Sequence, residues 1–396
     1  MLKPYYPGSC MSEHHLISQI VNIGETLHKA GCPPYKLEKY VEHYARNRGI
    51  EVMVLASANW INFQFNDEDN SVVIKRLKPP TIDLTLLALT INRITRDDES
   101  INLDSARPGR LMELFACLIV PAAYLSLVGS SMDALIISPL TGLIVWLCTL
   151  ALKGRRAIAL EFIAPLLVGL LAAFANSLGL NISVWTLCIA SILLFVPGLS
   201  IANALECLAF NDLVSGTSLL GQCALSLIKL FSGIFIGLSI GSAIWETTPV
   251  PYTNELPAYF TLIGAILLAI AVAIMFNIRP RDVVRAIPVI VIGTWGPTIL
   301  NFEHGWVAAT WLTSTLITLY ATWIAKRRKL TGTIYMIQGI ILMVPGSRVL
   351  VSVGQNFYAA ELLPIAGIGS SAALIFAAIV VGQITAYAIY SPKIER

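Results

Sequence analysis

Residues 182–204 read ISVWTLCIASILLFVPGLSIANA, an apolar stretch that contains no Lys, Arg, Asp or Glu. About 20 apolar residues are enough for a helix to cross the hydrocarbon core of a bilayer, so the stretch predicts a transmembrane helix. Val196-Pro197-Gly198 interrupts it. Because proline lacks a backbone N–H and clashes with the carbonyl four residues earlier, we expect a discontinuous helix at this point.

Further apolar segments follow and precede this one along most of the chain. Only 13% of the 396 residues are charged, which is about half the share of a soluble domain. We therefore predict a mainly α, polytopic membrane protein with about ten transmembrane helices. The expected spans are residues 111–130, 132–152, 157–178, 182–204, 217–245, 257–276, 282–301, 305–325, 331–353 and 369–390.

The basic residues orient these spans. With a cytoplasmic N-terminus, every loop on the inner side that carries a basic cluster obeys the positive-inside rule, and the outer loops hold no Lys or Arg. The prediction is a multi-pass protein of the cell inner membrane with both termini in the cytoplasm. The inner clusters are Lys153, Arg155 and Arg156; Arg279, Arg281 and Arg285; Lys326, Arg327, Arg328 and Lys329; and Lys393 with Arg396.

Two features recur at nearly one offset and predict an internal duplication. Val344-Pro345-Gly346 repeats the first interruption with its proline 148 positions after Pro197, and Ala378, Gly382 and Ala386 each lie 145 positions after Gly233, Gly237 and Gly241. Two five-helix repeats, residues 107–245 and 257–392, would enter the membrane with opposite orientations because five is odd. Inverted repeats are a recurring architecture of secondary transporters. We interpret the glycine rows as helix-packing surfaces.

Residues 1–106 are polar and predict a small soluble α+β domain, here called the head. Gly31 and Gly49 end its first two helices, and residues 66–70 form a turn between strands. The expected order is helix, helix, three strands, helix. These elements span residues 12–30, 34–48, 51–58, 59–65, 71–77 and 81–96.

Candidate substrate-binding residues surround the two interruptions and include two basic residues inside spans. A half-helix that starts near Leu199 or Ser347 presents free N–H groups and a positive dipole end, which suit a carboxylate. A plain proline kink is the alternative, and a basic side chain can also snorkel to the interface. The candidates are Pro197, Gly198, Ser200, Asn203, Lys229, Pro345, Gly346, Ser347 and Arg348.

Four acidic residues near span ends are candidates for proton coupling or for partners of these cations: Glu161, Glu206, Asp212 and Glu361. A solvated carboxylate at the interface is the alternative interpretation of each.

Other function classes lack their sequence signals. The seven cysteines have no CxxC spacing, and no His, Cys or carboxylate set has metal-ligand spacing, so we expect no metal and no cofactor. No GxxxxGK[ST] phosphate loop and no nucleophile–base arrangement occur, so we expect neither ATP drive nor an enzyme. A net charge of +3 does not favour nucleic acid. The expected partners are a small-molecule substrate and the lipid bilayer, and homo-oligomer formation stays open.

Over nearly its whole length the chain resembles the threonine/serine exporter family. In the head the resemblance lies in residues 23–32, IGETLHKAGC, and in Tyr35-Lys36-Leu37-Glu38; in the membrane it lies in Phe195-Val196-Pro197-Gly198 with Asn203, in Asp212-Leu213-Val214-Ser215-Gly216 and in Val344-Pro345-Gly346-Ser347. Cys207 stands where the family pattern has an acid, and Asn211 where it has a glycine. The resemblance implies a ten-span bacterial inner-membrane exporter with a cytoplasmic N-terminal domain and proton-gradient drive.

The sequence is compatible with three functions. The first is proton-coupled export of L-threonine and L-serine. The second is export of a small dicarboxylate such as succinate, which the resemblance allows because some relatives are associated with dicarboxylates. The third, from another class, is a membrane-anchored sensor or signalling protein. An anchor needs neither an inverted repeat nor broken helices, so the sequence favours transport.

Overall fold

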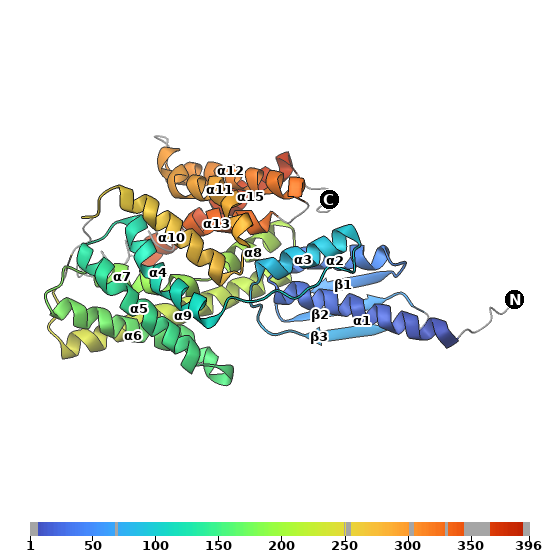
Figure 1. Ribbon diagram of the computed structural model, residues 1–396, viewed down its shortest axis with the longest axis horizontal. Coiled ribbons are helices and arrows are strands. Elements are labelled where there is room, and N and C mark those ends of the chain that lie inside the picture. The colour runs from blue at the N-terminus through green and yellow to red at the C-terminus, as the bar shows by residue number, and fades with distance from the viewer. Residues whose placement is uncertain are drawn as a thin grey trace.

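A computed structural model of the chain describes residues 7–67, 70–248, 250, 255–300, 305–328, 332–343 and 365–390. The head lies at one end of an elongated molecule, and the helical remainder of the chain, here called the body, extends away from it (Figure 1).

The head has the predicted element order. Each predicted element is present, and its ends differ from the predicted ones by at most five residues, because caps and turns, rather than apolar spacing, set the ends. For example, α3 starts at Leu84, where the Asp83 side chain accepts a hydrogen bond from the Leu86 N–H. The elements are α1 (Pro7–Lys29), α2 (Pro34–Arg46), β1 (Val52–Ala56), β2 (Trp60–Phe65), β3 (Val72–Arg76) and α3 (Leu84–Arg96).

The three strands form an antiparallel sheet in the order β1-β2-β3. One face of the sheet carries Ile61, Phe63 and Phe65, which are buried under the helices. Gly24 lets α1 pack closely against the sheet, because a Cβ at that position would lie 2.7 Å from the ring of Phe63. The apolar core of the head continues into the body, because the same buried cluster includes Leu199, Ala273 and Ile334.

The body consists of helices. They are α4 (Arg110–Val128), α5 (Met132–Ala151), the 3₁₀ turn η1 (Gly154–Ala159), α6 (Leu160–Ser177), α7 (Val184–Ile192), the 3₁₀ turn η2 (Leu193–Phe195), α8 (Gly198–Ala209), α9 (Leu213–Ile244), α10 (Tyr259–Met275), α11 (Pro280–Ile299), α12 (Trp306–Arg328), α13 (Thr333–Met343) and α15 (Ile365–Ile389).

Membrane character is clear from length and composition. Among the described residues, six helices are long and apolar enough to cross a bilayer, and a bent pair made of 184–195 and 198–208 can count as a seventh. The segments Tyr259–Met275 and Ala377–Ile389 are apolar but shorter. Ten spans and their inverted arrangement thus stay predictions.

A cap and a proline lie near the ends of two body helices. α9 begins at Leu213, four residues earlier than the predicted start at 217, because Asp212 caps it and accepts a hydrogen bond from the Ser215 N–H at 3.1 Å. α11 continues without interruption through Trp295-Gly296-Pro297. Pro297 lies so near the end of the helix that it removes few backbone hydrogen bonds, and the helix continues for two residues beyond it.

The glycine rows pack helices together, as interpreted from the sequence. A Cβ on Gly233 would lie 2.4 Å from the Phe162 carbonyl oxygen, and one on Gly237 would lie 2.2 Å from that of Leu166. α9 therefore presses directly on the backbone of α6. In the second half, a Cβ on Gly382 would lie 2.6 Å from the Trp311 carbonyl oxygen, so α15 presses on α12 in the same way.

The two halves of the body meet where α4 packs against α10. Ala116, Val120 and Ala123 of α4 form one buried cluster with Leu268 and Val272 of α10. Separate clusters fill the interior of each half. In Figure 1 the green helices α5 and α6 and the orange helices α11 and α12 lie on opposite sides of this junction.

The contact of Gly233 and Gly237 of α9 with the backbone of α6, here called the glycine seam, leads to a prediction about stability. Gly237→Ala should lower the apparent melting temperature of the purified protein, because overpacking of a tight contact costs ~1–3 kcal/mol. Gly221→Ala on the same helix is the matched control, since nothing lies within 4 Å of a Cβ there. Thermal unfolding in detergent measures both. Equal melting temperatures for the two variants would contradict the packing described here.

Candidate functional site

The chain breaks its own helix at Pro197, as predicted. α7 and η2 end at Phe195, α8 begins at Gly198, and the two pieces are bent by 62°. The Gly198 N–H donates to the Val196 carbonyl at 2.8 Å and does not continue the backbone hydrogen bonds of the preceding helix. The second Val-Pro-Gly element, with its candidates Pro345, Gly346, Ser347 and Arg348, lies outside the described residues, as does Glu361.

A cavity of about 300 Å³ lies against this break, within the size range of small-molecule sites. Its wall is mostly apolar and carries a few polar side chains. α6, α9, α10, the break itself and one residue of the head contribute to it. The lining residues are Ile82, Glu161, Leu193, Leu194, Phe195, Val196, Pro197, Gly198, Leu199, Ser200, Gln222, Cys223, Ser226, Leu268, Val272 and Phe276.

An ion pair stands at the edge of this cavity. The Lys229 Nζ lies 3.1 Å from Glu161 Oε2, and the Ser226 hydroxyl donates to Glu161 Oε1 at 3.0 Å. Both charged side chains are partly exposed, at 39% and 29%. The contact follows from the glycine seam, because Gly233 lies one turn after Lys229 and brings α9 against the start of α6. One positive and one negative charge therefore stand together at the edge of a small, mostly apolar cavity.

Glu206 lies elsewhere, at the contact between the body and the head. Its carboxylate is 2.9 Å from the Lys36 Nζ and accepts a hydrogen bond of 2.7 Å from the Tyr35 hydroxyl. Both members of the ion pair are about 95% buried. Burial raises the pKa of Tyr35 far above its usual value, so the hydroxyl stays protonated and donates. This carboxylate is held in a buried ion pair between the head and the body.

Comparison with known families agrees with the residues quoted above. A model of the threonine/serine exporter family matches residues 18–241, and a second model, described as threonine/serine exporter, ThrE, matches residues 261–389. The chain belongs to the threonine/serine exporter family. No curated protein and no solved structure matches it.

The structure of this exporter places some of the candidate residues at the cavity and others away from it. Pro197, Gly198, Ser200 and Glu161 line one cavity, and Lys229 reaches it through Glu161. Asn203 is half-buried on α8 and is not among the lining residues. Asp212 caps α9 by accepting a hydrogen bond from the Ser215 N–H. The Ser215 hydroxyl in turn donates to the Ala56 carbonyl of the head at 3.1 Å. Of the three acidic candidates that the structure describes, Glu161 is the one that lines the cavity.

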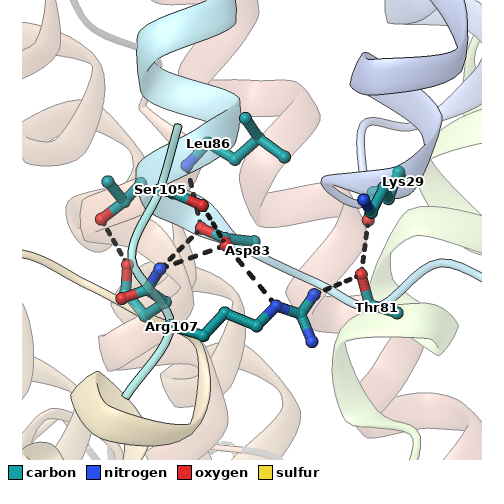
Figure 2. A network of polar contacts seen from close by, with 8 residues as sticks. Lys29, Thr81, Asp83, Leu86, Ser105 and Arg107 are labelled. Atoms are coloured by element: carbon teal, nitrogen blue, oxygen red, sulfur yellow. Dashed lines mark hydrogen bonds and ion pairs between the residues drawn. The ribbon is translucent and has the colours of Figure 1, made fainter. Parts of the chain in front are cut away.

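A second polar network joins the head to the exporter's second half and was not found from the sequence. Asp83 accepts hydrogen bonds from the Leu86 N–H at 2.9 Å, the Ser105 hydroxyl at 2.6 Å and the Asn277 amide at 3.1 Å, while Arg107 approaches it from the side (Figure 2). An aspartate after Pro79-Pro80 and before an apolar run is a helix N-cap signal. That signal could have identified the cap; nothing in the sequence points to Asn277.

The ion pair at the cavity makes a testable prediction. Lys229→Met and Glu161→Gln should each lower stability, and the double variant should lose less than the sum, because the coupling of a partly exposed pair is ~0.2–1 kcal/mol. Apparent melting temperatures of the four proteins measure it. The control cycle uses Lys75→Met and Glu25→Gln, whose pair is 3.0 Å long and more exposed, at 45% and 40%. Strict additivity at Lys229 and Glu161 would contradict the contact.

Proposed function

We propose that this chain is a secondary transporter of the inner membrane that exports L-threonine and L-serine in exchange for protons. The observation that carries the proposal is the Glu161–Lys229 pair at the edge of the cavity formed by the broken helix. Family membership supports transport, and the charges at the cavity support the substrate class.

The pair matches a zwitterion. An amino acid needs an anion for its ammonium group and a cation for its carboxylate, and Glu161 and Lys229 supply one of each within 3.1 Å. The start of α8 at Gly198, with its positive dipole end, adds a second group that suits the carboxylate. A dicarboxylate would instead meet Glu161 as a repelling charge. This argument favours the amino acid over the dicarboxylate alternative.

Glu161 also offers a route to proton coupling. A carboxylate that binds either a proton or the substrate's ammonium, but not both, couples the two in opposite directions. Protonation of Glu161 would release the ammonium and turn the carboxyl group into a hydrogen-bond donor. Glu206 and Asp212 are less suited to this role. Glu206 is paired with Lys36 of the head, and Asp212 caps α9.

The packing of the body supports the proposed inverted repeat. The third and fifth helices of each proposed repeat meet through glycine: α6 with α9, and α12 with α15. The first helices of the two repeats, α4 and α10, pack on each other, and a Cβ on Gly264 would lie 2.5 Å from the Ala123 carbonyl oxygen. A two-fold relation between the halves would place equivalent first helices side by side in this way.

Orientation can be tested by thiol labelling. In variants whose native cysteines are replaced, Leu178→Cys should react with an impermeant reagent in intact cells, and Arg155→Cys should react only after the cells are opened. Both side chains are exposed, so accessibility is set by the side of the membrane on which each lies. Labelling of Arg155→Cys in intact cells would overturn the orientation with a cytoplasmic head.

Transport itself is tested by counterflow in proteoliposomes with labelled threonine, serine and succinate side by side. We expect threonine and serine to exchange, and Lys229→Met to lower their exchange about tenfold or more, since a hydrogen bond to a charged group is worth ~1.5–3 kcal/mol. Lys75→Met, a surface lysine of the head, should exchange normally. Preference for succinate would support the dicarboxylate function, and the absence of any flux would support a sensor.

A further inference from the structure

We propose that the head is a gate over the cavity, held shut by the buried Lys36–Glu206 ion pair. The inference rests on the proposed function in that a gate presumes a transport cavity, and it assigns to the head a role in access to that cavity. Three independent observations carry it: a head residue in the cavity wall, a buried pair that ties the head to α8, and contacts of the head with both halves of the body.

The head contributes Ile82 to the cavity wall. Ile82 has a φ of +41°, which is rare for a β-branched residue and marks a strained backbone. Its neighbours hold it there, because the Thr81 N–H donates to the Lys29 carbonyl and the Asp83 N–H to the Ala30 carbonyl, each at 3.1 Å. A strained residue held by its surroundings at the wall of a ligand cavity is typical of a functional contact.

The ion pair is built as a buried interaction across the contact between head and body. Lys36 lies on α2 and Glu206 on α8, and both are about 95% buried. The Lys36 ammonium also lies 5.4 Å from the ring centre of Tyr387 on α15. Because removing one partner of a buried pair leaves an uncompensated charge, this contact favours a docked head strongly only while both partners are present.

The head also contacts both halves of the body. On the first half, the Ala56 carbonyl accepts from Ser215 of α9. On the second half, the Leu84 N–H donates to the Phe276 carbonyl at 2.9 Å, and Asn277 bonds Asp83. Phe276 also lines the cavity. The halves cannot move apart at this end while the head holds both, so opening of the cavity toward the head requires the head to undock.

Cys223 provides the test, because it lines the cavity and is 3% exposed. Purified full-length chain is treated with a maleimide, and mass spectrometry of its peptides gives the rate of modification at each cysteine. Cys188, which is fully buried on α7 and is not among the lining residues, reports general unfolding. We expect slow modification of Cys223 in the unaltered protein.

Lys36→Met should raise the rate at Cys223 about tenfold or more, since the loss of a buried partner exceeds the 1.4 kcal/mol that corresponds to tenfold, and should leave Cys188 unmodified. Lys75→Met, a lysine on the solvent side of the head, should change neither rate. The charge-reversed double variant Lys36→Glu with Glu206→Lys should bring the Cys223 rate back toward that of the unaltered protein.

An unchanged rate at Cys223 in folded Lys36→Met would overturn the proposal. If Lys36→Met also exposes Cys188, the isosteric Glu206→Gln decides, because it removes one charge of the pair: a faster rate at Cys223 alone supports the gate, and an unchanged rate rejects it. The measurement needs no substrate. If Lys36→Met speeds modification of Cys223 but the protein exchanges no threonine, the proposed function is rejected and the gate is kept. If threonine exchanges but Lys36→Met leaves the Cys223 rate unchanged, the gate is rejected and the proposed function is kept.

Discussion

The missing N–H of Pro197 is the constraint on which the arrangement around the cavity depends. It ends one helix at Phe195 and allows the next to begin at Gly198 with a bend of 62°. A straight helix would fill the space with its own side chains. The bend instead leaves a cavity between α6, α9 and α10, and it directs α8 toward the head, where Glu206 meets Lys36.

The sequence predicted those features that depend on neighbouring residues. Apolar length identified the long helices, Val-Pro-Gly identified the break, and four-residue glycine spacing identified the face of α9 that presses on α6. The order of elements in the head followed from turn glycines and short alternating strands. Each of these patterns is local, because a helix or a break is determined within a few turns of chain.

Contacts between distant residues were not predictable in the same way. Lys36 and Glu206 are 170 positions apart, and their pairing depends on how the head docks. Lys229 and Glu161 were each identified as candidates, since charges near apolar segments are costly, but their pairing depends on the glycine seam between two helices. Asp212, a candidate for proton coupling, caps α9, and its role in coupling stays a prediction.

The 32 residues of α9 make a rod about 48 Å long at 1.5 Å per residue, against a hydrocarbon core of about 30 Å. One rigid element thus carries the bond of Ser215 to the head, the cavity residue Cys223 and the seam glycine Gly237. Each residue turns a helix by about 100°. A single insertion or deletion between Ser215 and Gly237 would therefore rotate the head contact out of phase with the glycine seam. The length of this segment is fixed by geometry, whatever side chains its lipid-facing positions carry.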